Sequence, residues 1–386
     1  MILVKNCELF APEAQGRRDV LIGGGGFCAI AERIVPGALP SLTELDGAAL
    51  RMVPGLIDPN VHLTGGGGEG GPATQTSPPT FSDLLEGGIT TAIGCLGTDG
   101  YTRPVMDLLM KAKALRERGL SCWMHTGSYQ VPPPTISGDV ARDIILFDEI
   151  IGVGEVAVAD HRSSAPTLEE LTKLALAARV GGMLGGKCGV VFLHMGDGRQ
   201  PFDLVKRVVD TSELRATQFL PTHCTRNPHI FEEAKQWGQE GYVDLTASSF
   251  PFFPDEELKP SRAVVELLAA GVPLEHITVS SDSGASLPSF DSKGRLLKLT
   301  TGKAKSVFDE LRDLVEQEQL PLSDALKVFT SNAADILKLE RKGRISPHHD
   351  ADAVLLDDEF RIVHVIAKGR LLVKDGVHQH SSSGHA

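Results

Sequence analysis

Several features that mark other classes of protein are missing from this sequence of 386 residues. No apolar run approaches the roughly 18 residues needed to span a membrane, and Met1 leads into a strand-like segment without the charged and apolar regions of a signal peptide. Basic residues are outnumbered, since the formal net charge is −12 and the acidic residues are spread along the chain. We therefore expect no membrane insertion, no export, and no binding to nucleic acid or to anionic membranes.

A disulfide framework is also not indicated. The six cysteines have no CxxC spacing and lie mostly within apolar runs. Such cysteines are typical of buried thiols in a reducing compartment, so we expect a cytoplasmic protein whose cysteines are unpaired.

The composition that is present is that of a globular protein, with 41% hydrophobic and 23% charged residues. The length fits one large barrel-type domain plus an accessory module. Residues 1–52 and 345–380 read as short strands broken by turns. We expect these two ends to form one small β-sandwich domain beside a catalytic domain at residues 53–344. The polar tail HQHSSSGHA is left out of this interpretation.

Between these ends, apolar strand-like runs alternate with amphipathic helical stretches. The runs are Met52–His62, Thr90–Asp99, Ser121–Tyr129, Gly154–Arg162, Gly189–Asp197, Thr217–Arg226, Tyr242–Ser249 and His276–Gly284. Helical periodicity follows most of them, as in Val105–Arg118, Leu168–Arg179, Phe231–Gly238, Ala263–Ala270, Val307–Gln317 and Leu322–Leu339. Continuous apolar runs indicate buried parallel strands, and eight such units predict an α/β fold of the (β/α)8 TIM-barrel type. A doubly wound open sheet is the alternative.

In such a barrel, functional side chains gather where the strands end. Asn60 and His62 end the first predicted strand, His194 ends the fifth and His223 ends the sixth. Glu155 lies inside the apolar strand GEVAVA, where an ionised carboxylate needs a compensating cation. Two imidazoles and one glutamate with an open position are the ligands of a catalytic zinc site, so Glu155, His194 and His223 are candidate metal ligands. An ion pair between Glu155 and a nearby arginine is the alternative.

Further charged residues indicate the remaining parts of a hydrolytic site. Asp282, in TVSSDSG, could take a proton from an activated water and deliver it to a leaving amine, although this segment also resembles a helix N-cap. Glu69, in the glycine-rich loop Gly65–Gly71, could bind a substrate ammonium group. Arg162 and Arg226 could bind carboxylates, unless these charges are simply solvated. Together they describe a zwitterionic substrate such as a short acidic peptide.

Eight segments resemble those of the amidohydrolase superfamily, and within it those of the isoaspartyl (β-aspartyl) dipeptidases. They are PGLIDPNVHLTGGGGEGGP, GCLGTD, TGSYQVP, ADHRSSAP, RVGGMLGGK, FLHMGD, LPTHCTRN and SSDSGAS. The resemblance runs nearly end to end. It implies a (β/α)8 barrel flanked by a β-sandwich, a homo-oligomer, and hydrolysis of the isopeptide bond between an aspartate side-chain carboxyl and the next residue.

The resemblance also implies roles for individual residues. His62, His194, His223 and Asp282 match metal-site positions, and Asp282 also matches the catalytic acid/base. Tyr129 matches a tyrosine that polarises the scissile carbonyl as a neutral donor. The matches to substrate-binding positions are Glu69, which would hold the α-amine, and Gly67, Thr98, Arg162, Arg226 and Ser286.

Two positions depart from the family pattern. Asn60 stands where the family has a histidine, and Glu155 stands where it has a carboxylated lysine that bridges two metals. A glutamate keeps the negative charge, but an amide oxygen is a much weaker zinc ligand than an imidazole. We therefore expect one tightly held Zn²⁺ at Glu155, His194 and His223, with the other position weak or empty. This arrangement is similar to that of N-acetylglucosamine-6-phosphate deacetylases.

The sequence thus predicts a zinc-dependent hydrolase of β-aspartyl dipeptides, with a small acidic dipeptide as its substrate. An amidohydrolase acting on another amide, such as an N-acyl amino acid or a cyclic amide, is the second interpretation, because the altered metal site leaves the substrate open. A non-catalytic scaffold is the third. Asn60 favours the scaffold, whereas Asp282, Glu155 and the two histidines oppose it.

Overall fold

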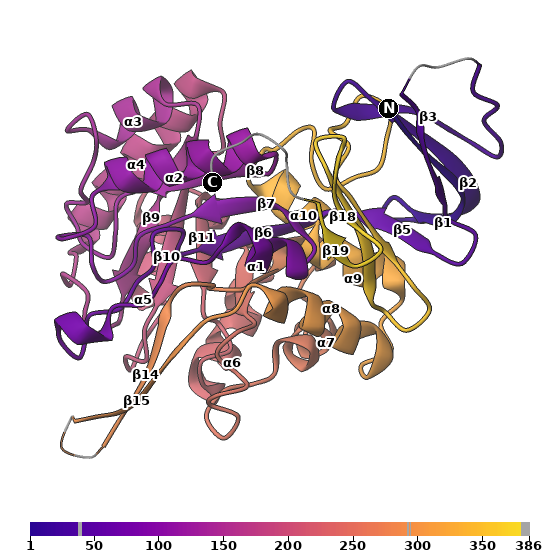
Figure 1. The fold of residues 1–386 in the computed structure, drawn as a ribbon. Coiled ribbons are helices and arrows are strands. Elements are labelled where there is room, and N and C mark those ends of the chain that lie inside the picture. The colour runs from indigo at the N-terminus through magenta and orange to yellow at the C-terminus, as the bar shows by residue number, and fades with distance from the viewer. Residues whose placement is uncertain (38–40, 292, 294, 380–386) are drawn as a thin grey trace.

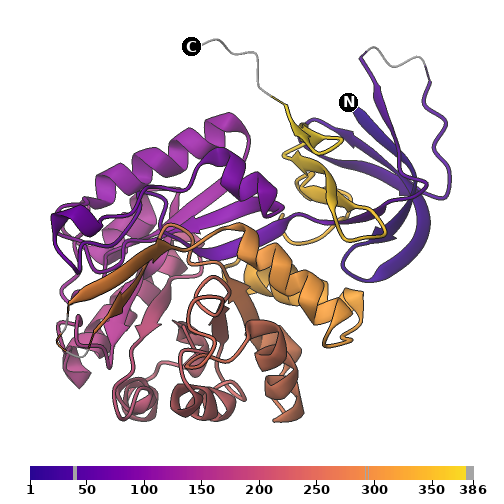
Figure 2. The same ribbon diagram turned by 60° about the horizontal axis from the view of Figure 1, so that its bottom comes forward.

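The computed structural model describes residues 1–37, 41–291, 293 and 295–379, so most of the polar tail set aside above lies outside the described residues. Figure 1 shows a barrel of strands wrapped by helices, and a β-rich unit that contains both the indigo N-terminal strands and the yellow C-terminal strands. Figure 2 shows the same β-rich unit beside the barrel from another direction. The fold is α/β, a (β/α)8 TIM barrel with a small β-sandwich built from both termini, as predicted. The doubly wound alternative was wrong.

In the described chain, nine strands from the two ends form one sheet. They are β1 (Ile2–Phe10), β2 (Ala14–Gly23), β3 (Gly26–Ala31), β4 (Thr43–Asp46), β5 (Arg51–Pro54), β16 (Ala353–Leu356), β17 (Ile362–Ala367), β18 (Arg370–Lys374) and β19 (Val377–His378). β5 joins the two groups, because it pairs antiparallel with β16, with Val53 opposite Val354. The buried side chains of Val4, Ile22 and Leu355 belong to a separate small core in this unit. The domain boundaries 1–52, 53–344 and 345–380 stay a prediction.

The barrel strands run parallel and follow one another around the wall. They are β6 (Leu56–Val61), β7 (Ile89–Gly94), β8 (Ser121–Thr126), β9 (Ile150–Val158), β10 (Val190–Met195), β11 (Phe219–Thr222), β12 (Val243–Thr246) and β13 (Ile277–Ser280). Two contacts bring the last strand to the first. Ser283 bridges Val61 in parallel, and the N–H of Asp282 donates to the carbonyl of Asn60 over 3.0 Å. The carboxyl ends of the strands therefore open on one face.

The chain passes from the terminal sheet into the barrel at Gly55. The single run predicted at Met52–His62 is two strands, β5 and β6, which belong to different sheets. Glycine is needed between them, because a Cβ atom at Gly55 would lie 2.2 Å from the hydroxyl oxygen of Thr90. The change of sheet at this point therefore depends on a residue without a side chain.

Helices surround the barrel. They are α1 (Phe81–Glu86), α2 (Val105–Arg118), α3 (Val140–Leu146), α4 (Leu168–Gly185), α5 (Asp203–Thr211), α6 (Pro228–Trp237), α7 (Pro260–Ala269), α8 (Lys305–Glu316), α9 (Leu322–Phe329) and α10 (Ser331–Ile336), with 3-10 turns at Pro72–Thr74, Ala216–Gln218 and Leu274–His276. Capping boxes begin α1 at Thr80 and α4 at Thr167, and the Asn227 side chain caps α6. These caps satisfy N–H groups that the helix itself leaves unpaired.

Some of the predicted elements were wrong or missing. The single helix predicted at Leu322–Leu339 is two helices, because Thr330 leaves the helical conformation, with φ −140° and ψ −85°. The short helices α1, α3 and α5 were not predicted, since such short segments hold few apolar repeats. A hairpin of β14 (Ser286–Phe290) and β15 (Leu296–Thr301) was also not predicted, and it projects away from the barrel in Figure 1.

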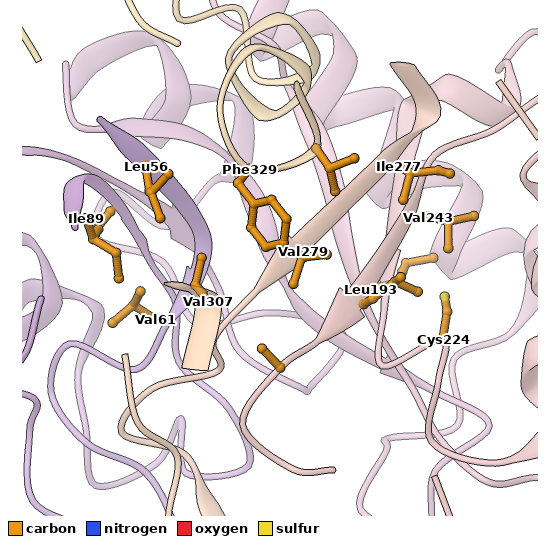
Figure 3. Close-up of a cluster of buried hydrophobic side chains, with 14 of the residues drawn as sticks. Leu56, Val61, Ile89, Leu193, Cys224, Val243, Ile277, Val279, Val307 and Phe329 are labelled. Carbon is orange, nitrogen blue, oxygen red and sulfur yellow. The ribbon is translucent and has the colours of Figure 1, made fainter. Parts of the chain in front are cut away.

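The main hydrophobic core lies between the barrel strands and the surrounding helices. Figure 3 shows Phe329 of α9 beside Val279 of β13, with Leu56 of β6 and Ile89 of β7 in the same cluster. Phe329 is fully buried, and truncating a buried phenylalanine to alanine typically costs about 3–5 kcal/mol. This packing fixes the strands whose ends carry the polar residues described next.

All six cysteines are free, as predicted, but they are not all buried, since Cys28 on β3 is exposed. Cys28 lies on β3, which forms one edge of the terminal sheet. No helix in the described part of the chain combines the length and the apolar character that crossing a membrane requires.

Candidate active site

A cavity of about 790 Å³ opens at the carboxyl ends of the barrel strands. Every site residue predicted from the sequence lines this cavity except Glu155, which is fully buried. These residues follow strands from β6 to β13 and so come from most of the length of the chain. The barrel therefore gathers them, because parallel strands present their carboxyl ends on the same face.

Glu155, in β9, is the centre of a buried cluster. Its Oε1 atom lies 3.1 Å from Nδ1 of His194 and 2.9 Å from Nε2 of His223. The ligand atoms of these three residues lie within 4.8 Å of one another, close enough for one metal ion to contact all three. His223 has a left-handed backbone, with φ 62°, which is uncommon outside glycine and frequent at functional positions.

Burial and neighbouring groups set the charges in this cluster. Burial opposes the ionisation of Glu155, but His194 and His223 outweigh it and hold the pKa of the carboxyl well below its ordinary value. Burial, together with His194, lowers the pKa of His223 to about 4. Burial raises the pKa of the Tyr129 phenol well above its ordinary value, and the charge of Glu155 adds to the effect. At neutral pH the cluster therefore holds a carboxylate beside a neutral imidazole and a neutral phenol.

Both ring nitrogens of His194 have close neighbours, and Nδ1 is the nitrogen that faces Glu155. Nε2 lies 3.0 Å from Oδ2 of Asp160 and 3.1 Å from Nη2 of Arg162. Nδ1 lies 3.1 Å from Oε1 of Glu155, so a cation between these two atoms would have one nitrogen and one oxygen ligand. The Tyr129 hydroxyl stands beside the cluster, 2.6 Å from the same Nδ1 atom. Two imidazoles and one carboxylate fit a divalent metal such as catalytic zinc.

A second group of ligand-type atoms lies at the other oxygen of Glu155. Nε2 of His62 is 3.6 Å from Oε2 of Glu155 and 3.0 Å from Oδ1 of Asp282. Cys95, the residue after β7, places its Sγ atom 3.9 Å from Nε2 of His62 and 2.8 Å from Oδ1 of Asn60. The Asn60 amide also donates to Asp282 over 3.4 Å. Asn60 therefore contacts both a thiol and a carboxylate.

Glu69 extends from the glycine-rich loop and is held by two hydroxyl groups. Thr98 donates to its Oε1 atom over 3.1 Å, and Ser286 donates to its Oε2 atom over 3.0 Å. Gly67 has φ 79°, and a Cβ atom there would lie 2.5 Å from the carbonyl oxygen of Thr74, so this loop conformation requires glycine. The structure thus brings these predicted substrate contacts together, with a carboxylate oriented by neutral donors.

The two predicted arginines both approach Asp160. Arg162 donates from Nε to Oδ1 over 2.9 Å and from Nη2 to Oδ2 over 2.7 Å, and its Nη1 atom lies 3.4 Å from Glu69. Burial of Asp160 is outweighed by Arg162 and His194, which hold the pKa of this carboxyl well below its usual range. Arg226 makes a longer contact with Asp160, 3.5 Å. Arg162 therefore has a bidentate carboxylate partner within the protein, whereas the contact of Arg226 with the same carboxylate is longer.

Two aspartates form a polar layer inside the barrel. Asp244 of β12 accepts hydrogen bonds from the hydroxyls of Thr222, Thr278 and Ser280, each 2.6 Å long. Asp58 of β6 accepts in a similar way from the segment after β13. Burial raises the pKa of each carboxyl to about 7. These bonds tie β11, β12 and β13 together and so fix the backbone that carries the site.

Sequence reasoning gave no role to Cys95, Asp160 or Thr246, although all three lie at or just beyond strand ends. The Thr246 hydroxyl lies 2.7 Å from Nδ1 of His223, which turns Nε2 of that ring toward Glu155. The signal was their position, since the ends of barrel strands are where site residues gather. Cysteine and threonine fit a buried strand equally well, so residue type alone did not single them out.

Comparisons with known proteins agree with this arrangement. Residues 223–372 match the amidohydrolase family. An allantoinase from Deinococcus radiodurans is 25% identical over 92% of this chain and 86% of its own length. The crystal structure of a β-aspartyl dipeptidase from Fervidobacterium islandicum AW-1, in complex with the β-Asp-Leu dipeptide, is 40% identical, with a TM-score of 0.91 over 99% of this chain and 100% of that one. A D-hydantoinase from Thermus sp., 16% identical with a TM-score of 0.71 over 99% and 97% of the two chains, shares the fold.

The match to the Fervidobacterium enzyme covers both the barrel and the terminal β unit, so it does not depend on one motif or one domain. The family match covers the last strands of the barrel and most of the C-terminal strands of that unit. These findings show that the chain belongs to the amidohydrolase superfamily and, within it, resembles the isoaspartyl (β-aspartyl) dipeptidases.

Proposed function

We propose that this protein is a metal-dependent hydrolase of β-aspartyl dipeptides. The observation that carries the proposal is the placement of the Glu155, His194 and His223 cluster beside a cavity that also presents Glu69 and Arg226. A metal-ligand set next to one anionic and one cationic side chain suits a small zwitterion that bears carboxylates. The 40% identical Fervidobacterium structure, a β-aspartyl dipeptidase with β-Asp-Leu, supports the same substrate class.

Glu155, His194 and His223 would hold the ion, and zinc suits this set of nitrogen and oxygen ligands. When bound, such an ion lowers the pKa of a coordinated water and polarises the carbonyl of a substrate. From the sequence we expected a single tightly held zinc, because the amide oxygen of Asn60 is a poor zinc ligand. The number of bound ions stays a prediction.

The chain's own side chains supply the other parts of the reaction. Asp282, held at the cavity by its left-handed backbone (φ 54°), accepts a proton from the attacking water and returns it to the leaving amine. Tyr129, kept neutral by burial, donates a hydrogen bond to the oxyanion that develops on the carbonyl. Glu69 binds the substrate ammonium group, and Arg226, with Arg162, binds carboxylates.

Turnover of defined peptides tests the proposal. Zinc-loaded protein is incubated with β-Asp-Leu, α-Asp-Leu, N-acetyl-leucine and dihydroorotate, and the release of products is measured. We expect hydrolysis of β-Asp-Leu above the other three compounds. Hydrolysis of N-acetyl-leucine or dihydroorotate in preference to β-Asp-Leu would reject the dipeptidase assignment.

Hydrolysis of another amide, such as an N-acyl amino acid or a cyclic amide, is the second candidate. It is supported by the allantoinase that matches 92% of this chain at 25% identity. The two candidates differ in their need for an ammonium group on the substrate, which Glu69 would bind.

A Glu69→Gln variant isolates this need. Loss of one charge-assisted hydrogen bond should lower kcat/KM for β-Asp-Leu by roughly 10- to 100-fold. The N-acetylated form of the same dipeptide is the control, because it has no ammonium group and should lose little. An equal loss on both substrates would contradict the role of Glu69 in binding the amine.

The homo-oligomeric state and the cytoplasmic location remain predictions from the sequence.

A further inference from the structure

We propose that Cys95, together with His62, Glu155 and Asp282, forms a second divalent-cation site, in which the Cys95 sulfur replaces the histidine that the family has where Asn60 stands. This inference rests on the proposed metal centre, because the second ion would share Glu155 with the first. It makes Cys95 a metal ligand rather than a structural thiol.

The position of Cys95 follows from the pairing of the first two barrel strands. β6 and β7 run parallel, with Val61 opposite Gly94, so the residues just beyond them, His62 and Cys95, lie side by side. The N–H of Cys95 donates to the carbonyl of Val61 over 3.1 Å, which fixes the backbone there. Cys95 is completely buried and His62 is 4% exposed.

The separations between these atoms are compatible with ligands of one ion. Two ligand atoms about 2.0–2.3 Å from one tetrahedral zinc lie roughly 3.3–3.6 Å from each other. Nε2 of His62 lies 3.6 Å from Oε2 of Glu155, 3.9 Å from Sγ of Cys95 and 3.0 Å from Oδ1 of Asp282. The ligand atoms of His62, Cys95 and Glu155 all lie within 4.8 Å of one another, and Asp282 adds an oxygen on the His62 side.

An unpartnered atom gives independent support. Oε2 of Glu155 is buried without a hydrogen-bond partner among the described residues, while Oε1 of the same carboxylate faces His194 and His223. A buried carboxylate oxygen without a partner is unfavourable. The atom faces His62, so an ion bound between them would satisfy it and would make Glu155 a bridge between two positions.

The chemistry of the donor set accounts for Asn60. Asn60 accepts a hydrogen bond from Sγ of Cys95 and donates to Asp282, so it positions two of the proposed ligands. An amide can also donate, so a turn of its side chain would offer N–H to a thiolate. The other cysteines have no such side-chain oxygen partner among the described residues. Their sulfurs donate to backbone carbonyls, and that of Cys7 also contacts Sδ of Met52; they are Cys7, Cys28, Cys122, Cys188 and Cys224.

A thiolate ligand changes the expected metal content and preference. Two ions would be neutralised in part by Glu155, Asp282 and the Cys95 thiolate, so the second position regains the charge and affinity that Asn60 alone would not give. Sulfur favours zinc, cobalt and cadmium over magnesium or manganese. The expectation of one tightly held zinc from the sequence would then be replaced by two.

Cobalt substitution tests the inference on the full-length protein. Chelator-treated protein is titrated with Co²⁺ under anaerobic conditions, and a sulfur-to-cobalt charge-transfer band is followed in the near ultraviolet while bound metal is counted by mass spectrometry. We expect the band and two equivalents in the wild type. Cys95→Ser and Cys95→Ala should lack the band and hold one equivalent. Cys122→Ala is the matched control, since Cys122 is also buried in a barrel strand, and it should keep both.

The outcomes separate this inference from the proposed function. A wild type without the band, or Cys95 variants that keep the band and both ions, would overturn the second site, whatever the turnover. Circular dichroism of the variants shows that they are folded, and the wild-type spectrum does not depend on any substitution. If β-Asp-Leu is left intact by a protein that shows the band and two ions, the substrate assignment fails while the second site stands.

Discussion

Replacement of Glu155 by glutamine separates metal binding from the stability of the fold. Glutamine keeps nearly the same shape but removes the buried charge whose Oε1 atom lies 2.9 and 3.1 Å from two ring nitrogens. A buried carboxylate is costly to desolvate, so the metal-free variant should be as stable as the wild type or more stable. With zinc present, the order should reverse, because only the wild type gains stability from the bound ion.

The size of this gain follows from linkage. Free zinc at 100 times its Kd stabilises the folded state by about 2.7 kcal/mol. An unfolding entropy of about 2.1 cal/mol/K per residue amounts to about 0.8 kcal/mol/K for 386 residues. The wild type should therefore melt about 3 °C higher with zinc. A variant whose affinity falls about a thousandfold would gain about 0.1 kcal/mol or less at the same zinc concentration, which is too little to see.

The assay is thermal unfolding of chelator-treated protein with and without zinc, followed by circular dichroism. Glu310→Gln is the matched control, because Glu310 is also a buried glutamate, 5% exposed, but lies on α8 and accepts from the N–H of Ser261. That control should keep the full zinc-induced shift. A Glu155→Gln protein that also keeps it would refute the argument that Glu155 binds the metal.

Three other substitutions follow from the geometry. Asp282→Asn should lower kcat by roughly 100- to 10,000-fold. Metal analysis of this variant should still find the ion that Glu155, His194 and His223 hold. Turnover near that of the wild type would show that Asp282 is not the acid/base. Thr246→Val deletes the hydroxyl 2.7 Å from Nδ1 of His223. It should weaken zinc binding by roughly 10- to 100-fold, measured by competition with a chelator. Thr91→Val is the control, because it removes a buried hydroxyl without a partner in the described chain, and it should leave zinc binding unchanged. Burial raises the pKa of Asp244 to about 7, so the folded state keeps a proton that the unfolded chain loses near pH 4. The contribution of Asp244 to the free energy of unfolding therefore falls by on the order of 4 kcal/mol as the pH rises from about 4 to about 7. Asp244→Asn should therefore flatten the pH dependence of urea unfolding measured at pH 5 and pH 8, and an unchanged dependence would show that Asp244 is not the group responsible.

Local patterns were enough to predict the class of fold. Apolar runs such as the one that became β10 (Val190–Met195), alternating with helical periodicity, depend only on neighbours in the chain, and they predicted the barrel. The same local patterns did not predict the short helices or the breaks between elements. The break at Thr330 and the change of sheet at Gly55 depend on contacts with other segments, which periodicity does not report.

For the candidate site, too, some features were predictable from the sequence and others depended on the tertiary structure. The sequence by itself placed His62, His194, His223 and Asp282 at strand ends and flagged Glu155 as a charge within an apolar strand. Only the tertiary structure decided which oxygen of Glu155 faces which histidine, and that Arg162 is engaged by Asp160. It also placed Cys95 beside His62, because strand register sets that neighbour and residue type does not. The physical reason is that a metal centre is a set of distances between side chains from different strands, and those distances are determined only when the ring of strands closes and brings Asn60 to Asp282.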